Sequence, residues 1–224
     1  MLIGRKWVNG VLKPAVFLAS MAPAALLVWD TIAGNLSANP IEDVTHRTGR
    51  WGLTFLLITL AVTPLRRLTR LSQLGLLRRM LGLFAFFYLS LHFAIYFGLD
   101  QFFSLEDIVE DVAKRPYITV GFSSFLLLLP LALTSTKKMI KRLGGKRWTR
   151  LHRLVYVAAA GGVLHFLWQV KADTRDPVIY GVVLVVLLAL RLWGGKGRGR
   201  NRHAPTEEIG LSGGDKVDVR ELSI

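Results

Sequence analysis

The chain has 224 residues, of which 52% are hydrophobic, and its 29 Lys and Arg against 15 Asp and Glu give a net charge of +14. A mean hydropathy of +0.41 is too high for an ordinary soluble domain with this many cations. Cysteine is absent from the sequence, which excludes disulfides, thiolate metal sites, cysteine-held iron–sulfur clusters and c-type haem attachment. Any redox centre therefore needs other ligands, among which histidine is the main candidate.

Six apolar blocks follow one another along the chain, and the charged residues gather between them. Each block approaches the ~20 residues that a membrane-spanning helix needs. The sequence therefore predicts an all-α integral membrane protein built as a bundle of six transmembrane helices. The blocks are Pro14–Ala33, Gly49–Leu65, Leu81–Leu99, Tyr117–Leu133, Leu151–Val170 and Pro177–Trp193.

Lys and Arg are distributed unevenly between the loops. With the N-terminus in the cytoplasm, most of them fall in the N-terminal segment, in the loops at 66–79 and 137–153, and in the tail. This is the positive-inside pattern, so the charge predicts an orientation with both termini cytoplasmic and not a nucleic-acid partner. The exceptions are Arg47, Arg50, Lys114, Arg115, Lys171 and Arg175.

The segment at 100–117 is expected on the outer side of the membrane. Ser104, with Asp107 three residues later, resembles a helix capping box, and apolar and acidic residues recur after it at helical spacing. One interpretation is an amphipathic helix in the membrane interface. Another is a docking surface for an outer partner, to which Arg47 and Arg50 also contribute, and the two interpretations are compatible.

A polar segment over residues 195–224 follows the membrane domain at 1–194. Its glycines neither follow a strand nor open a βαβ unit, so they do not indicate a dinucleotide fingerprint. The tail is expected to lie in the cytoplasm, solvated or on the lipid surface.

Two of the five histidines are expected at the same depth in the membrane. His92 lies 13 residues beyond Arg79, near the cytoplasmic start of the third block, and His165 lies 13 residues beyond His152, near the start of the fifth. Two histidines on facing helices at one depth suit axial ligation of a haem iron. The alternative is that each imidazole only hydrogen-bonds a neighbouring carbonyl group.

His152 is expected at the cytoplasmic boundary, level with Arg78 and Arg79. As a ligand it would place a second haem about 20 Å from the first, at ~1.5 Å of rise per residue; otherwise it is solvated. Thirteen residues at ~100° each leave His152 and His165 roughly 140° apart around an ideal helix, so a kink or the reach of the side chains must bring them to one side. The remaining two histidines are expected to be solvated: His46 in an outer loop and His203 in the tail.

Three stretches of the sequence carry a resemblance to a known family. They are HRTGRWGLTFLLITLAVTPLRR from His46, LLRRMLGLFAFFYLSLHFAIY from Leu76 and KRWTRLHRLVYVAAAGGVLHFLW from Lys146. They resemble the MsrQ (YedZ) family of haem-binding membrane subunits, within the larger ferric reductase-like transmembrane family that includes the NADPH oxidases. The resemblance extends over nearly all of the chain to about Trp193.

This resemblance implies one or two b-type haems and electron transfer across the bacterial inner membrane. His92 and His165 then hold one haem, and His152 belongs to a second. The implied partner is a periplasmic molybdenum-cofactor enzyme, MsrP, which reduces methionine sulfoxide in oxidised proteins. The implied donors are the quinone pool or a cytosolic flavin reductase, and FMN is associated with the family. The chain is then an electron-transfer subunit in contact with membrane lipid, and not itself the methionine sulfoxide reductase.

The sequence departs from the larger family in two places. That family usually has a second histidine on the third helix, 14 residues before the first, where this chain has Arg78. Arg78 or Arg79 then contacts a haem propionate, takes the sixth iron position or only marks the membrane boundary. The oxidases also continue into flavin and nicotinamide domains, for which the residues after Trp193 are too few, so we expect a relay that does not itself oxidise NADPH.

Two other functions remain open from the sequence. A membrane cytochrome of this kind could serve another acceptor, such as ferric iron. A haem-free transporter or assembly protein could use the histidines for proton transfer or packing. Transporters more often have inverted repeats or broken helices with intramembrane carboxylates, whereas Asp30 is the only acidic residue inside a block here, and it lies near the end of that block.

Overall fold

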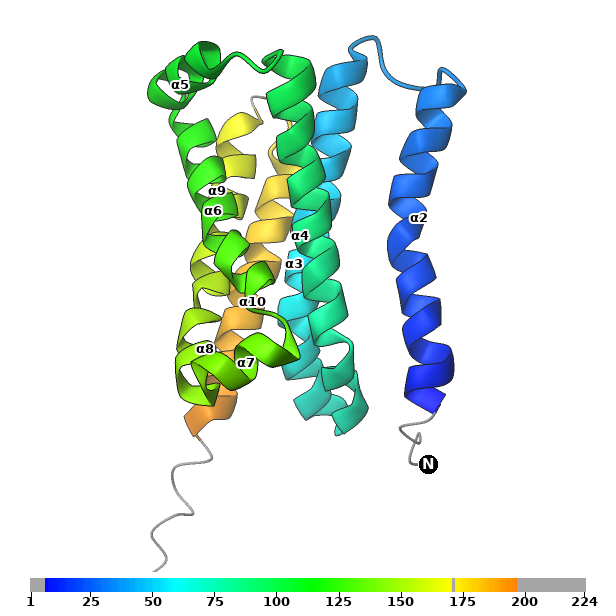
Figure 1. The fold of residues 1–224 in the computed structure, drawn as a ribbon, viewed down its shortest axis with the longest axis vertical. Coiled ribbons are helices and arrows are strands. Elements are labelled where there is room, and N and C mark those ends of the chain that lie inside the picture. The colour runs from blue at the N-terminus through cyan, green and yellow to red at the C-terminus, as the bar shows by residue number, and fades with distance from the viewer. Residues whose placement is uncertain (1–6, 171, 197–224) are drawn as a thin grey trace, which may run out of the picture.

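The computed structural model describes residues 7–170 and 172–196, and every regular element in these ranges is helical (Figure 1). The predicted tail lies outside the described residues from 197 onward, as do His203 and Lys171. The helices are α2 (Lys13–Ile32), α3 (Pro40–Thr69), α4 (Arg78–Ile95), α5 (Leu105–Lys114), α6 (Pro116–Leu133), α7 (Lys137–Leu143), α8 (Gly145–Leu151), α9 (Leu154–Gln169) and α10 (Arg175–Lys196), with short π or 3₁₀ turns η1 (Val8–Leu12), η2 (Ser72–Leu76) and η3 (Tyr96–Asp100).

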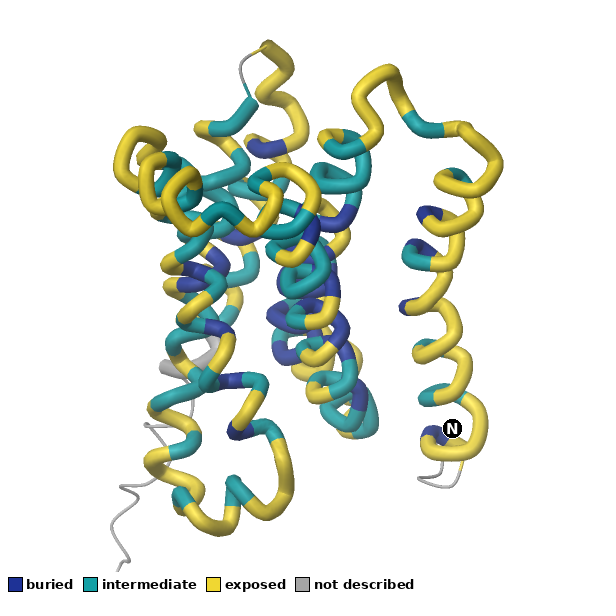
Figure 2. Tube along the Cα trace, turned by 45° about the horizontal axis from the view of Figure 1, so that its top comes forward, coloured by how far each residue is buried: buried dark blue, intermediate teal, exposed yellow. Residues whose placement is uncertain are grey.

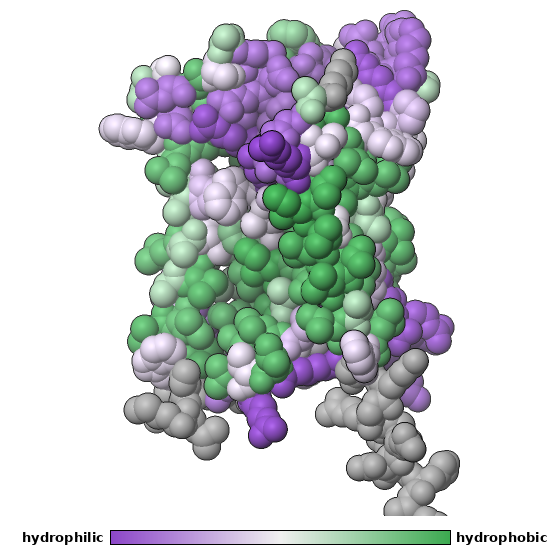
Figure 3. Space-filling view, turned by 180° about the vertical axis from the view of Figure 1, so that it is seen from behind, coloured by the Kyte–Doolittle hydropathy of each residue, from purple (hydrophilic) through white to green (hydrophobic). Residues whose placement is uncertain are grey.

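The prediction of six membrane spans is confirmed. Six helical stretches are long and apolar enough to cross a membrane. Their apolar side chains form a continuous belt between two polar ends in Figure 3. The stretches are Val8–Ile32, Pro40–Thr69, Arg78–Asp100, Pro116–Leu133, Gly145–Gln169 and Arg175–Trp193.

The two ends of the bundle differ in their short helices. α7 and α8 lie together with the start of α4 at one end, and α5 lies at the other (Figure 1). We call the first the basic end, because α7, α8 and the α3–α4 connection carry most of the Lys and Arg of the described loops. The opposite end is called the α5 end.

Local sequence signals account for where the helices begin. The side chain of Asn39 accepts a hydrogen bond from the amide of Glu42 at 3.4 Å, and Pro40 occupies the first turn of α3. Ser104 caps α5 by accepting from the amide of Asp107 at 3.2 Å, as the sequence predicted. Both residues satisfy backbone amides that a helix start leaves without partners.

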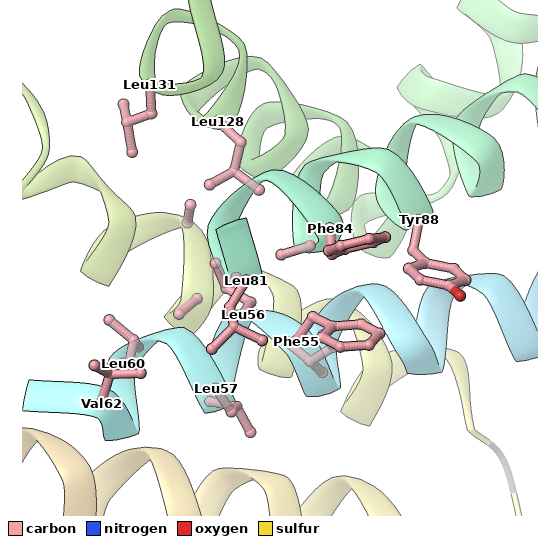
Figure 4. Packing of buried hydrophobic residues seen from close by; sticks show 14 of the residues in the cluster. Phe55, Leu56, Leu57, Leu60, Val62, Leu81, Phe84, Tyr88, Leu128 and Leu131 are labelled. Carbon is pink, nitrogen blue, oxygen red and sulfur yellow. The ribbon is translucent and has the colours of Figure 1, made fainter. Parts of the chain in front are cut away.

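The core lies where α3 and α4 pack against each other and against α6 and α9. α3 supplies much of the buried surface, and its side chains pack against those of α4 (Figure 4). Leu128 and Leu131 of α6 belong to the same cluster. Phe55 of α3 stacks on Tyr88 of α4 with ring centres 5.3 Å apart and planes 11° apart. The close packing of α3 with α4, and of α6 with α9, produces two helix pairs that face each other.

α2 stands apart from these helices, and most of its surface is exposed (Figures 1 and 2). Its main polar attachment is Tyr88, which donates from its hydroxyl to the carbonyl oxygen of Ser20 at 2.7 Å and accepts from the amide of Ala24 at 3.1 Å. Ser20 and Ala24 are four residues apart and would otherwise bond each other. The Tyr88 hydroxyl is therefore inserted into the backbone ladder of α2, next to Pro23.

The fifth span is not one continuous helix. α8 ends at His152, which is its C-cap, and α9 starts at Leu154 after a turn at Arg153. His152 and His165 are therefore not on one ideal helix. The angle of roughly 140° between them, which was calculated for an ideal helix, does not apply. The departure from one ideal helix falls at the turn formed by His152 and Arg153.

A candidate haem-binding site

His92 is fixed on α4 by the neighbouring helix α3. Its Nδ1 lies 2.8 Å from the carbonyl oxygen of Thr45, so this nitrogen carries the proton and donates. The ring rests on Gly49, one turn after Thr45, where a Cβ atom would lie 2.9 Å from Nδ1. Gly49 therefore leaves room for the imidazole, and Thr45 sets its tautomer.

His165 is fixed on α9 in the same way by α6. Its Nδ1 lies 2.7 Å from the carbonyl oxygen of Tyr117. The ring rests on Gly121, again one turn later, where a Cβ atom would lie 2.6 Å from Nδ1. The ring of Tyr117 also lies beside the imidazole, with centres 6.0 Å apart.

The two imidazoles face each other across the bundle. Their ring centres are 6.2 Å apart, and their planes are inclined by 74°. In each ring a backbone carbonyl accepts the Nδ1 proton, so Nε2 retains its lone pair, which is the state of a metal-ligating histidine. Neither Nε2 has a hydrogen bond within the described residues.

The separation of the two rings fits one metal ion between them. Two metal–imidazole bonds of about 2.0 Å each, added to the two ring radii, put the centres of axial imidazoles roughly 6 Å apart. Among the described residues, no group of three or more His, Asp or Glu is arranged to hold a metal ion. A pair of histidines without further protein ligands is what haem iron needs, since the porphyrin supplies the other four nitrogens.

Gly161 and Gly162, which lie between His152 and His165, are both used in helix packing. A Cβ atom at Gly161 would collide with Oγ of Ser124 on α6, and one at Gly162 would lie 3.3 Å from Leu53. These glycines let α9 approach α6 and α3.

His152 lies near the basic end and has a different environment. Its Nδ1 is 3.1 Å from the carbonyl oxygen of Trp148, and the Trp148 ring stacks on the imidazole with centres 3.9 Å apart. The indole in turn donates to the carbonyl oxygen of Thr134 at 3.0 Å. Nε2 of His152 is buried and has no hydrogen-bond partner within residues 7–170 and 172–196.

A cavity of about 290 Å³ adjoins His152, and we call it the inner cavity. Arg78 and Arg79 line it, together with Trp148 and apolar residues of α3, α4 and α6. The two arginines that the sequence placed level with His152 therefore share a cavity with it. A buried imidazole nitrogen without a partner, beside two guanidinium groups, suits a ligand that combines a metal ion with anionic groups.

A groove of about 500 Å³ lies between α2 and α4, and we call it the α2–α4 groove. Lys13 and Arg79 are its cations, and the rest of its lining is apolar or aromatic. Arg79 and Leu83 line both this groove and the inner cavity. The two spaces are thus separated by one layer of α4 side chains. The apolar lining residues are Phe17, Met21, Leu76, Met80, Leu83, Phe84 and Phe87.

The sequence misplaced His46 and gave no role to Arg191. His46 is not in a solvated loop but in the second turn of α3, half-buried, with Nε2 against the side-chain amide of Gln169. Arg191 lies in the sixth predicted span, on α10, and its Nη1 is buried without a hydrogen-bond partner among the described residues. Hydropathy predicted which segments near these residues are apolar, but it does not predict which side chain of another helix contacts each residue.

The proposed docking features at the α5 end are partly engaged within the chain. Arg47 pairs with Asp30 at 2.6 Å and with Asp43 at 2.8 Å, and Arg50 pairs with Asp176 at 3.3 Å. The Arg47–Asp30 pair joins α2 to α3, whereas the Arg47–Asp43 pair lies within α3. Arg47 therefore has a structural role that the sequence did not predict.

Comparison with known proteins places these features in a family. Residues 48–163 match the family described as "Ferric reductase like transmembrane component", a range that includes His92 and His152 and ends two residues before His165. Three relatives carry the name "Protein-methionine-sulfoxide reductase heme-binding subunit MsrQ". The relative from Herminiimonas arsenicoxydans is 52% identical over 194 residues, which cover 85% of this chain and 89% of the relative. That from Rhodospirillum rubrum is 52% identical over 195 residues (86% and 92%), and that from Caulobacter vibrioides is 48% identical over 181 residues (81% and 86%).

Proposed function

Because the chain belongs to the ferric reductase-like transmembrane family and, within it, to the MsrQ haem-binding subunits, we propose that it relays electrons across the bacterial inner membrane to a periplasmic reductase. The reductase is a molybdenum-cofactor enzyme of the MsrP type, which reduces methionine sulfoxide in oxidised proteins. Haem b, when bound, supplies one-electron chemistry through its iron. The chain itself binds and orients this group and does no chemistry on the sulfoxide.

The observation that carries this proposal is the matched pair of His92 and His165. Their 6.2 Å separation and their carbonyl-bound Nδ1 atoms support a bis-histidine haem near the α5 end. α3 and α6 hold the two imidazoles in position before any ligand binds, so little ordering is required on binding. We call this the outer site.

A second, inner site is proposed at His152. Its unpaired Nε2 and the adjacent Arg78 and Arg79 support an iron ligand with cations for the propionates. Two sites at different depths would carry an electron over most of the membrane thickness.

The direction of transfer follows from charge. The basic end is the cytoplasmic end by the positive-inside rule, so the outer site is the one nearer the periplasm. The partner then docks at the α5 end, where α5 presents Glu106, Asp107 and Glu110 to solvent.

The α2–α4 groove supports a quinol as the electron donor. It lies beside the surrounding lipid, it is mostly apolar, and it shares Arg79 and Leu83 with the inner cavity. A quinol bound there would be oxidised to the quinone, passing its two electrons one at a time across a single side-chain layer and releasing its two protons to water. The alternative donor is the cytosolic flavin reductase with FMN that the family implies. The reconstituted assay described below distinguishes the two donors.

The test is an absorption spectrum of the detergent-purified chain, oxidised and dithionite-reduced, with haem quantified per chain. We expect about two low-spin b-type haems in the wild type. His92→Ala or His165→Ala should remove one, and His152→Ala should remove the other. His203→Ala, after the last span, is the matched control. A chain without haem under haem-sufficient conditions would end the relay proposal.

A reconstituted assay tests the acceptor and the donor. Methionine sulfoxide should be consumed only when the periplasmic reductase is added to the reduced chain. Reduction by a quinol analogue in vesicles, without flavin reductase, supports the groove as donor site. Reduction of ferric iron at the same rate without the reductase would favour the ferric-iron cytochrome instead.

A further inference from the structure

Two buried side-chain nitrogens have no hydrogen-bond partner among the described residues, and both lie near the basic end. One is Nε2 of His152, and the other is Nη1 of Arg191 on α10. An unpaired buried nitrogen on a cation is the more costly of the two, because the charge has lost its water without gaining an acceptor. Arg191 therefore requires an explanation of its own.

The surroundings of Arg191 supply cations and an aromatic ring but no anion. Its guanidinium lies over the ring of Tyr156, 4.9 Å from the centre, and Nη1 of Arg67 lies 3.4 Å from its carbonyl oxygen. Arg67 and Arg78 are its electrostatic neighbours. None of the ion pairs formed by the described Asp and Glu residues includes Arg191. A buried guanidinium among other cations is destabilising unless an anion joins them.

Arg191 and His152 converge on the same region. Tyr156, under the guanidinium, is four residues after His152 and so lies one turn away along the chain. Arg78 is an electrostatic neighbour of both His152 and Arg191, and it lines the inner cavity. His152 and Arg78 line the inner cavity, and Arg191, which is not one of its lining residues, is linked to it through Arg78.

We propose that Arg191 binds a carboxylate of the cofactor held at the inner site, so that α10 completes a binding site whose iron ligand comes from the α8–α9 turn. This inference rests on the proposed function, since it needs a haem at His152. A haem has the chemistry that the two unpaired groups require, an iron for the imidazole and propionate carboxylates for a guanidinium. The guanidinium fork matches a carboxylate with two parallel hydrogen bonds.

The test compares haemin with its dimethyl ester, which has the same iron and ring but no carboxylate. The chain is prepared without haem and carries His92→Ala, so that only the inner site binds. Arg191→Gln should weaken haemin binding by about 10- to 100-fold, the loss of a hydrogen bond to a charged group, and should leave the affinity for the ester within about twofold. Arg191→Lys should recover part of the loss. Arg150→Gln, an exposed cation on α8, is the control and should change neither affinity.

Two results would overturn the proposal. One is equal weakening of haemin and ester by Arg191→Gln, which would make the residue structural. The other is unchanged haemin binding in Arg191→Gln. If the same variant then loses FMN binding, the guanidinium binds a phosphate; if it does not, the guanidinium has another role. His152→Ala in the same background separates this failure from that of the inner site. If His152→Ala weakens haemin binding and Arg191→Gln does not, only this inference is refuted. If His152→Ala leaves haemin binding unchanged, the inner site itself is refuted.

Discussion

His92 and His165 are held in the same manner on two different helix pairs. Each imidazole rests on a glycine of the facing helix, and each Nδ1 bonds the carbonyl oxygen one turn before that glycine. The arrangement pairs α4 with α3 on one side and α9 with α6 on the other. A backbone carbonyl group and a glycine one turn later thus orient both imidazoles, although the two segments have little sequence in common.

Adding one methyl group to either glycine should displace its histidine. In Gly121→Ala the new Cβ would lie 2.6 Å from Nδ1 of His165, and in Gly49→Ala it would lie 2.9 Å from Nδ1 of His92. We expect both variants to lose the outer-site low-spin haem bands, Gly121→Ala more completely. Haem per chain and the reduced spectrum are the measurements. Gly145→Ala, where the added atom meets nothing within 4 Å, should bind haem normally, and full haem occupancy in Gly121→Ala would contradict this account.

Trp148 is expected to position His152 for the inner site. Its ring stacks on the imidazole, and its indole nitrogen is tied to Thr134. Trp148→Leu should weaken inner-site haem binding by about tenfold, from the loss of a stack and one hydrogen bond, and Trp148→Phe should weaken it less. Haemin titration in the His92→Ala background measures this, with Trp29→Leu on exposed α2 as control. Equal affinity in Trp148→Leu and wild type would show that the turn alone fixes His152.

Filling the α2–α4 groove should slow reduction by quinol without removing haem. Met21 of α2 lines the groove but not the inner cavity, so a Met21→Trp side chain should occupy the groove and reduce the rate of quinol-driven haem reduction by about tenfold. The dithionite-reduced spectrum should stay unchanged. Leu129→Trp, on the exposed face of α6, serves as the matched insertion. If both variants accept electrons from quinol at the wild-type rate, the donor enters elsewhere.

Removing the Tyr88 hydroxyl should loosen α2. Tyr88→Phe keeps the stack on Phe55 but leaves the Ser20 carbonyl and the Ala24 amide to re-form their own bond, at a net cost of about 1–2 kcal/mol. We expect a lower melting temperature in detergent and faster proteolysis of the α2–α3 connection, with haem content retained. The control is Tyr156→Phe, because the hydroxyl group of Tyr156 makes no hydrogen bond among the described residues. A Tyr88→Phe protein with unchanged melting would mean that α2 is held by other contacts.

The sequence predicted the spans and the depth of the histidines better than it predicted their partners. Hydropathy reports which segments leave water, and residue counting from Arg79 and His152 correctly brought His92 and His165 together. The partners Thr45 and Tyr117 are backbone groups of other helices, and no side-chain pattern marks them. The sequence indicated a kink between His152 and His165 as one possibility but did not locate the turn at His152–Arg153, because neither residue is a proline or a glycine. His46 was misjudged because the polar residues around it start a helix that extends beyond the apolar block.

The loose attachment of α2 separates two tasks within one chain. α2 is held by the Tyr88 hydroxyl, by the Asp30–Arg47 pair and by an edge contact between Phe17 and Phe84, whereas the imidazoles are carried entirely by α3, α4, α6, the α8–α9 turn and α9. Tilting α2 therefore breaks few contacts and disturbs none of those that position the histidines. In the relay proposed above, successive lipid-soluble donors would exchange with the bilayer through this side while the histidines keep a constant geometry. Binding and release of the donor would then be mechanically independent of cofactor retention.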